Sequence, residues 1–495
     1  MFFLVFSSTV FLFAFLPITL AGYYFLPRRF RNGFVTLASL LFYAWGEPKF
    51  VLIMCLSIFM NYLFGLLVVR REDDAYRRGI LTMMVISNLS LFFVFKYLNF
   101  TIENLNVLLG GILPQTHIRL PIGISFFTFQ AMSYVFDVSL GRGEVQKNPL
   151  NVALYISLFP QLIAGPIVRY ETVAEEIQNR QESLEDFVRG IRRFTVGLAK
   201  KVLLSNSIGL LADQAFGFGE ASQLSVAMAW LGVLAYAFQI YFDFGGYSDM
   251  AIGLGLMFGF HFDENFCYPY ISRTVAEFWQ RWHISLGSWF RDYLFYPVSR
   301  KMGPLSKRVK QRWGKQAGRL APSVVGLAVV WLCTGIWHGA SWGYILWGVY
   351  YGVLLISALI FQPVFKKLVK KCGIHTQSPG FALFQIVRTM LLVLLGYVLF
   401  RSVTLGAAVD YYRAMFALAG NALTDPSAGF ALRNHASVLV LCAVSSTPIL
   451  GFLQHRFGGL FVSETVKNIA CMLLLILSTA YIVSSSYNPF IYFAF

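Results

Sequence analysis

Long apolar runs constrain this chain more than any other feature. They recur from Phe2 to Val483, each about 15 to 25 residues long, enough or nearly enough to cross roughly 30 Å of hydrocarbon as a helix. With 57% hydrophobic and 13% charged residues, the chain has too few polar side chains to cover a soluble surface. We therefore expect an all-α polytopic membrane protein with about 11 to 13 helical segments; the run lengths argue against a β-barrel.

The net charge of +16 does not indicate nucleic acid binding, because the basic residues cluster between the apolar runs. No basic residue precedes the first run and Arg28, Arg29 and Arg31 follow it, which predicts an uncleaved first helix with its N-terminus outside. Eight basic residues without an acid lie between Arg300 and Arg319, and we place this block on the cytoplasmic surface against anionic lipid, or simply as a topology signal.

Counting from that block predicts the last crossings of the membrane. They are expected over residues 324–338, 342–361, 383–400, 438–453 and 468–483, which leaves the C-terminal residues 487–495 outside. The stretch from Arg169 to Lys201 mixes acids and bases around apolar positions, as an amphipathic cytoplasmic helix does.

The first polar interruption of the apolar pattern runs from Gln239 to Asp249. Ionisable residues at membrane depth are costly unless they are paired or used. We expect a broken or closely packed helix that lines a cavity with Gln239, Asp243, Tyr247 and Asp249. The alternative is a short loop in which Ser248 or Asp249 caps the next helix.

The second interruption, residues 277–293, combines charges with three tryptophans. On one continuous helix His283 would neighbour Trp279 and Gln280 on one side and Leu286 and Gly287 on the other. The alternative is an interfacial amphipathic helix in which His283 is packed and has no chemical role.

The third interruption ends an apolar run in Trp337, His338 and Gly339, followed by Ser341 and Trp342. A neutral imidazole is a natural proton acceptor near pH 7, and the small residues beside it would let a substrate approach. The alternative is a helix terminus at the outer membrane interface.

The sequence predicts no metal site. The six cysteines lie far apart without a C-x-x-C pair, and zinc protease, serine hydrolase and P-loop motifs are absent. Spacing also disfavours a zinc site at Cys333 and His338, five residues apart.

Taken together, these segments resemble the membrane-bound O-acyltransferase family, most closely its bacterial branch acting on alginate and peptidoglycan. The motifs that carry the resemblance are, in order, LFPQLIAGPIVRY at 158–170, FDFGGYSD at 242–249, NF with YPY at 265–270, EFW through RDY at 277–293, and WHG at 337–339. The resemblance implies one membrane domain over residues 1–495, with core motifs at about 119–361, that forms a helical ring around a tunnel.

The resemblance also implies roles for particular residues. His338 would be the general base and His283 would position or polarise the acyl group. The C-terminal Pro-Phe-Ile-Tyr-Phe-Ala-Phe would present Tyr492 as a transient acyl carrier, or else only anchor the tail at the interface. The residues expected to line the tunnel are Asp243, Gln239, Tyr247, Asp249, Trp279, Trp337, Ser341 and Asn265.

The implied reaction takes acetyl-CoA, or another acyl thioester, from the cytoplasm as a substrate without a bound cofactor. Arg291, or the basic block, would attract the donor phosphates. The implied partners are the bilayer, an extracellular SGNH-hydrolase-like acetyltransferase and a polysaccharide acceptor, in a bacterial cytoplasmic (inner) membrane. Two alternatives remain: a polysaccharide or lipid-linked sugar transporter, which would work without His338, and a non-catalytic recruiting subunit.

Overall fold

The computed structural model describes residues 4–217, 223–373, 375–456, 463–485 and 487–491. Its regular structure within these ranges is helical, without a strand. Nine of the described helices are long and apolar enough to cross a bilayer. This confirms the predicted all-α polytopic membrane protein.

The chain divides into two compact units. Unit 1 comprises Met1–Leu203, Asp243–Glu264 and Glu464–Phe495, and unit 2 comprises Leu204–Phe242 and Asn265–Ser463. One long helix, α12 (Val226–Met257), contributes to both units.

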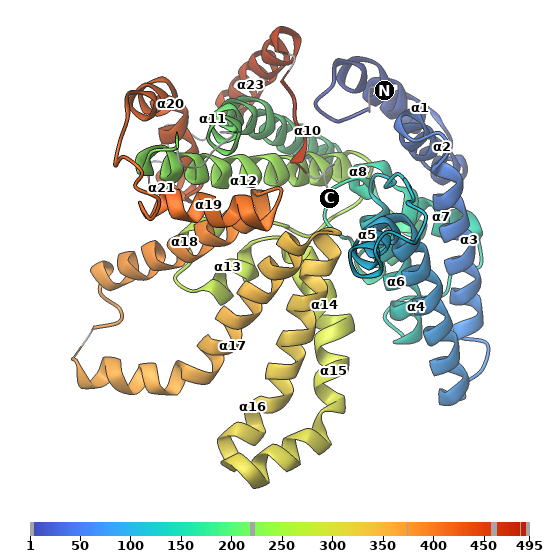
Figure 1. Ribbon diagram of the computed structural model, residues 1–495. Helices are drawn as coiled ribbons and strands as arrows, with labels where there is room; N and C mark the ends of the chain where they lie inside the picture. Colours follow the sequence, from blue (N-terminus) through green and yellow to red (C-terminus); the bar gives the residue numbers. More distant parts are fainter. Residues whose placement is uncertain (1–3, 218–222, 374, 457–462, 486, 492–495) are drawn as a thin grey trace. The chain divides into compact units, whose positions relative to one another are not determined.

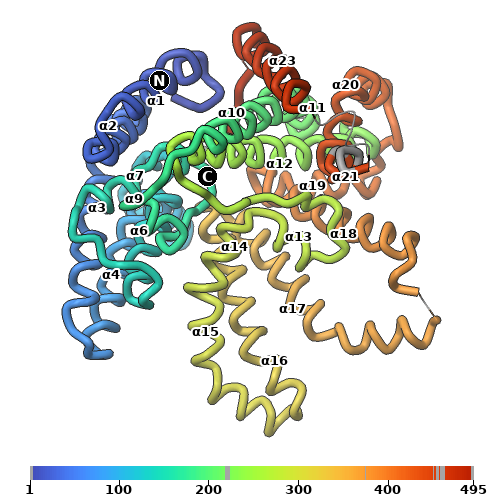
Figure 2. The backbone as a smooth tube through the Cα atoms, turned by 180° about the vertical axis from the view of Figure 1, so that it is seen from behind, coloured from blue at the N-terminus to red at the C-terminus, as the bar shows by residue number. Residues whose placement is uncertain are grey.

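Unit 1 contains most of the N-terminal half and the last helix. Helices α3, α4 and α6 pack against one another (Figures 1 and 2). The remaining bounds are η1 (Phe11–Phe15), α1 (Leu16–Phe25), α2 (Arg28–Gly46), α3 (Val51–Val68), α4 (Asp74–Lys96), α5 (Leu98–Leu109), α6 (Ile124–Ser139), α7 (Pro149–Ser157), α8 (Phe159–Leu162), α9 (Tyr170–Asn179), α10 (Leu184–Ala199) and α23 (Glu464–Ser484).

Unit 2 is built around the long pair α16 and α17, which run side by side (Figure 1). The π-helix η2 (Lys200–Ser205) leads into it. Its bounds are α11 (Asn206–Phe216), η4 (Pro269–Ile271), α13 (Val275–Arg281), α14 (Ile284–Phe290), η5 (Arg291–Phe295), α15 (Tyr296–Lys301), α16 (Gly303–His338), α17 (Trp342–Lys371), α18 (Pro379–Arg401), α19 (Leu405–Met415), α20 (Pro426–Ser445) and α21 (Ile449–Arg456).

Pairs of glycines bring α10 and α12 into close contact in unit 1. A Cβ on Gly246 would lie 2.7 Å from the carbonyl oxygen of Gly197, and a Cβ on Gly253 would lie 2.6 Å from that of Gly190. On each helix the two glycines are seven residues apart, which is two helical turns. They therefore lie on the same face of the helix, where α10 and α12 cross. The closely packed helix predicted at residues 239–249 is confirmed, whereas the broken helix and the capped loop are wrong: α12 continues through the segment.

One other expectation about the helices needs correction. The crossing predicted over 438–453 is wrong, because α20 ends at Ser445 and α21 begins at Ile449. The break falls at Pro448, which has no backbone N–H to continue the helix. The basic block is helical and lies within α15 and α16, and α16 turns sharply at Gly314, where φ is 89° and ψ 171°, a conformation open essentially only to glycine.

Candidate active site

His338 is the last residue of α16. Its side chain is 4% exposed, and the rings of Trp337, Trp347 and Phe400 lie 4.8, 4.9 and 5.1 Å from the imidazole, centroid to centroid. The helix ends there because the chain turns at Gly339 and Ser341 caps α17, its hydroxyl accepting the N–H of Gly343 at 3.2 Å. The predicted Trp-His-Gly helix end is confirmed.

The hairpin of α16 and α17 fixes this imidazole through backbone contact. A Cβ on Gly335 would lie 2.6 Å from the carbonyl oxygen of Tyr344, and one on Gly348 would lie 2.4 Å from that of Trp331. At Gly339 the missing Cβ leaves room for the ring of Tyr344, 2.5 Å away. The prediction that small residues here admit a substrate is therefore wrong at Gly335 and Gly339, whose space α17 fills.

His283 lies at the junction of α13 and α14 rather than on one continuous helix. It has φ 47° and ψ 53°, a left-handed conformation that is uncommon for a residue other than glycine. The predicted helical neighbours of His283 are thus incorrect. The conformation is held by Asn265, whose carbonyl oxygen accepts the N–H of Ile284 at 3.0 Å and whose side-chain oxygen accepts the N–H of Ser285 at 3.2 Å.

The same amide oxygen determines which nitrogen of His283 carries the proton. A backbone N–H such as that of Ser285 can only donate, so the Asn265 atom that it faces is the oxygen. Nδ1 of His283, 3.2 Å from that oxygen, therefore donates, and Nε2 is the basic nitrogen. His283 lies outside the nine candidate spans, and burial lowers the pKa of its imidazole to about 3.

The structure brings the two histidines to one aromatic ring. Trp337 lies 5.9 Å from the imidazole of His283 and 4.8 Å from that of His338, centroid to centroid. The two residues are 55 positions apart in the sequence, and no helical periodicity relates them.

Two further candidates are the indole of Trp347, whose ring lies 4.9 Å from the imidazole of His338, and that of Trp279, which packs against Trp347. The N–H groups of Trp279 and Trp347 are buried without a hydrogen-bond partner among the described residues, and their rings are 5.5 Å apart. A buried N–H donor without an acceptor is costly in a folded protein. These two donors are therefore available to an oxygen atom of a substrate; Trp347 was not recognised in the sequence because it lies inside an apolar helical run.

Three other predicted site residues of unit 2 make different contacts. Gln239 is buried on α12, and its side-chain oxygen has no partner among the described residues. Ser341 acts as the helix cap described above. Arg291 is about half exposed and pairs with its neighbour Asp292 at 3.0 Å.

The predicted acidic residues of unit 1 have separate partners. Asp243 forms an ion pair with Lys201 at 2.7 Å, whereas Asp249 pairs with Lys200 at 2.6 Å and with Arg193. The sequence pattern does not identify Lys201 as the partner of Asp243, although a buried carboxylate at membrane depth requires a cation. Tyr247 packs its ring between Phe6, 4.5 Å away, and Phe490, 4.8 Å away. Tyr492 lies outside the described residues.

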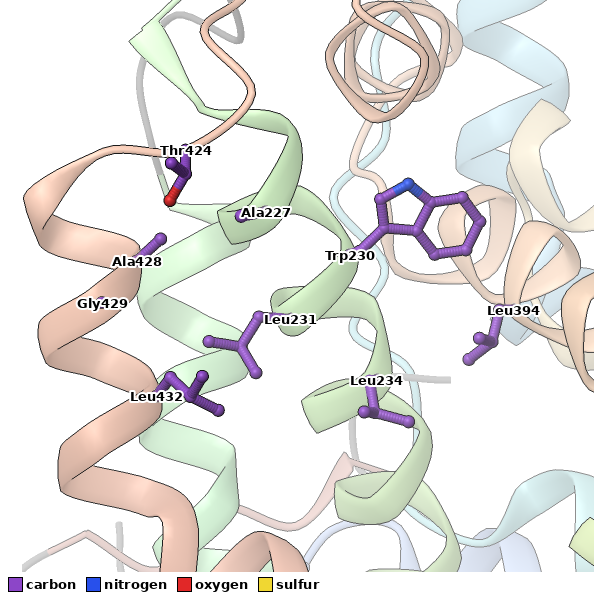
Figure 3. Close-up of a pocket in the computed structure, with 9 residues that line it drawn as sticks. All are labelled: Ala227, Trp230, Leu231, Leu234, Leu394, Thr424, Ala428, Gly429 and Leu432. Carbon is purple, nitrogen blue, oxygen red and sulfur yellow. The ribbon is translucent and has the colours of Figure 1, made fainter.

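An apolar groove on unit 2 is separate from these residues. It encloses about 360 Å³ between α12, α18 and α20, and its lining includes Trp230, Leu234, Leu394 and Leu432 (Figure 3). None of the predicted site residues lines it and it has no ionisable side chain, so it has no group that could act as an acid or base. Within the described ranges no cluster of three or more His, Cys, Asp or Glu side chains has the arrangement of a metal site.

Comparison with known proteins identifies the family of this site. A family model described as MBOAT, membrane-bound O-acyltransferase family, matches residues 40–399. The chain belongs to this family. It is accordingly an O-acyltransferase, and His283 and His338 both lie within the matched part.

Curated relatives of this O-acyltransferase agree with that assignment. One, named probable alginate O-acetylase AlgI, from Pseudomonas syringae pv. tomato, is 40% identical over 420 residues that cover 83% of this chain and 75% of the relative. The peptidoglycan O-acetyltransferase of Helicobacter pylori is 31% identical over 541 residues, covering 100% of this chain and 98% of the relative. The teichoic acid D-alanyltransferase of Bacillus subtilis is 30% identical over 250 residues, covering 50% and 60%.

Proposed function

We propose that this O-acyltransferase moves an acetyl group from acetyl-CoA in the cytoplasm toward hydroxyl groups of a cell-surface polysaccharide. The acceptor class is an alginate-like exopolysaccharide or peptidoglycan, because relatives that cover most of the chain carry those names. The observation that carries the proposal is the placement of two buried imidazoles next to the ring of Trp337.

His338 acts as the general base. One of its ring nitrogens takes the proton of the attacking hydroxyl as the hydroxyl oxygen bonds to the thioester carbonyl carbon. The tetrahedral oxyanion then collapses, the carbon–sulfur bond breaks, and the proton passes from His338 to the leaving thiolate. The indole N–H groups of Trp279 and Trp347 donate to the oxyanion, which removes the cost of leaving them unpaired.

His283 has a positioning role in this scheme. Since Nδ1 donates to Asn265, Nε2 can only accept a hydrogen bond. It therefore orients a substrate hydroxyl or N–H group and does not polarise the acyl carbonyl.

The first acceptor is the hydroxyl of Tyr492, which then delivers the acetyl group to an SGNH-hydrolase-like partner on the outer side. The chain lies in the bacterial inner membrane with both termini outside, as the positive-inside pattern predicts. Exposed cations of the basic block, together with Arg291, attract the donor phosphates from the cytoplasm.

The test measures O-acetyl groups on surface polymers in a deletion strain complemented with wild type, His338→Ala, His283→Gln or Tyr492→Phe at matched membrane levels. We expect His338→Ala to lose a factor of about 10² to 10⁴ in transfer, the usual contribution of a general base. Full rescue by His338→Ala would return the transporter or the recruiting subunit to first place. Full rescue by Tyr492→Phe would remove the relay alone.

A further inference from the structure

The C-terminal tail of unit 1 is held by a buried pair of opposite charges. The side chain of Lys201 is 3% exposed and that of Asp243 is 1% exposed, and Nζ lies 2.7 Å from Oδ1. Each charge also binds the backbone of the tail: Lys201 Nζ donates to the carbonyl oxygen of Pro489, and the N–H of Ile491 donates to Oδ2 of Asp243 at 2.9 Å. We propose that Lys201 and Asp243 form a binding site for the main chain of the C-terminal tail.

The chemistry of the ligand follows from the atoms that are contacted. The site offers one donor and one acceptor to a carbonyl and an N–H two residues apart, which are groups that every peptide carries, as in β-strand addition. Selectivity comes from a different contact, the ring of Phe490 against Tyr247 at 4.8 Å. The ligand class is therefore an extended peptide segment with an aromatic residue between the two bonded positions.

A second anchor fixes the tail four residues before Tyr492. The side chain of Asn488 bonds Ser7 in both directions, donating from Nδ2 to Oγ at 3.0 Å and accepting from Oγ at 3.3 Å. The two anchors together bind residues 488, 489 and 491. Ile491 is adjacent to Tyr492 in the chain, so the site restrains the backbone that carries the proposed acyl acceptor.

A purely stabilising role explains the buried pair of Lys201 and Asp243 less well than a role in binding the tail. Removing two charges from water is costly, and replacing a buried pair by apolar residues of similar volume is often neutral or stabilising. Six residues further along α12, Asp249 provides a natural contrast. It pairs with Lys200 and Arg193, both about one-third exposed, and makes no hydrogen bond to the described tail residues 487–491. The adjacent lysines 200 and 201 thus serve two different carboxylates, and only the more deeply buried pair binds the tail.

The experiment measures hydrogen exchange of the C-terminal segment 485–495 by mass spectrometry on the full-length protein in detergent. We expect Lys201→Met combined with Asp243→Leu to leave the protein folded and to raise exchange of the tail amides at least tenfold. Asp249→Asn is the matched control, because it neutralises a carboxylate on the same helix without touching the tail, and it should leave exchange unchanged. Unchanged tail exchange in the folded double variant would overturn the proposal.

A pair of tail variants keeps the test independent of folding. Ile491→Pro removes the N–H that Asp243 accepts, whereas Ile491→Ala keeps it. We expect faster exchange at the remaining tail amides and loss of transfer in the proline variant only. Equal exchange in the two variants would refute main-chain recognition.

The function of the tail anchor rests on the proposed acyl relay through Tyr492. The experiments distinguish failure of the relay from failure of the anchor. A failed relay gives a Tyr492→Phe protein with full transfer and a protected tail. A failed anchor gives unchanged exchange in the charge-pair and proline variants, whatever happens to transfer.

Discussion

The histidine site of unit 2 and the tail site of unit 1 both bury polar groups, but they handle charge differently. His338 is enclosed by aromatic rings and His283 donates to the neutral amide of Asn265. Lys201 and Asp243, by contrast, face each other as full charges. A base must give up its proton again, which a neighbouring carboxylate would hinder. A peptide anchor must hold backbone dipoles, which full charges do more strongly than neutral groups.

The largest expected effect on stability comes from removing one charge of the Lys201–Asp243 pair and leaving the other. Asp243→Ala leaves the ammonium of Lys201 buried without its carboxylate, and we expect a loss of about 3 to 5 kcal/mol in the free energy of unfolding. Lys201→Met with Asp243→Leu should lose far less. Unfolding by titration with sodium dodecyl sulfate measures both, and a double variant as unstable as the single one would show that the charges themselves stabilise the fold.

The free energy of unfolding should depend on pH, because His283 is neutral in the folded protein. The folded pKa of His283, about 3, lies below the value of about 6.5 expected for an exposed histidine, so the unfolded chain binds one more proton between these two values. The stability contributed by the neutral imidazole is complete above pH 6.5 and falls as the pH drops toward 3. Between pH 7 and pH 5 the wild type should lose about 2 kcal/mol more than His283→Gln.

The corresponding measurement compares unfolding of the two proteins at both pH values. Equal losses would mean that His283 is protonated in the folded protein. The histidine site would then carry a buried charge, as the site of Lys201 and Asp243 does.

The smallest expected effect is at Asp249. Its cations are partly exposed, so Asp249→Asn should cost about 1 kcal/mol or less in the free energy of unfolding and leave transfer near the wild-type level. High salt should weaken this contribution, whereas it should change that of Lys201 and Asp243 little. Loss of transfer in Asp249→Asn, measured by acetyl content at matched expression, would show that both carboxylates of α12 serve the reaction.

Much of the fold could be predicted from the sequence, because helix formation depends on the local pattern of apolar and polar residues. Apolar run length predicted the long helices, and the end of α16 at His338 followed from the Trp-His-Gly sequence. The errors also have local causes. Residues 438–453 are apolar enough for one helix, but Pro448 interrupts it, and apolarity alone does not report a missing N–H.

The candidate active site could be predicted only in part from the sequence. His283, His338 and Asp243 stood out because polar residues among apolar ones are costly. The left-handed backbone of His283 did not, because nothing in a histidine side chain requires φ 47°; Asn265, 18 positions away, holds it there.

The sequence by itself determined that this protein is helical, membrane-embedded and supplied with a few costly polar groups, because hydrophobicity and helical period are properties of neighbouring residues. Tertiary structure decided which of those groups meet. Lys201 and Asp243 are 42 positions apart and lie 288 and 248 positions from the tail residues that they bind, and these bonds go to backbone atoms. Only packing of distant helices brings such groups within hydrogen-bond distance, because the energy that selects the pairing is spread over the whole interface and is encoded in no single motif.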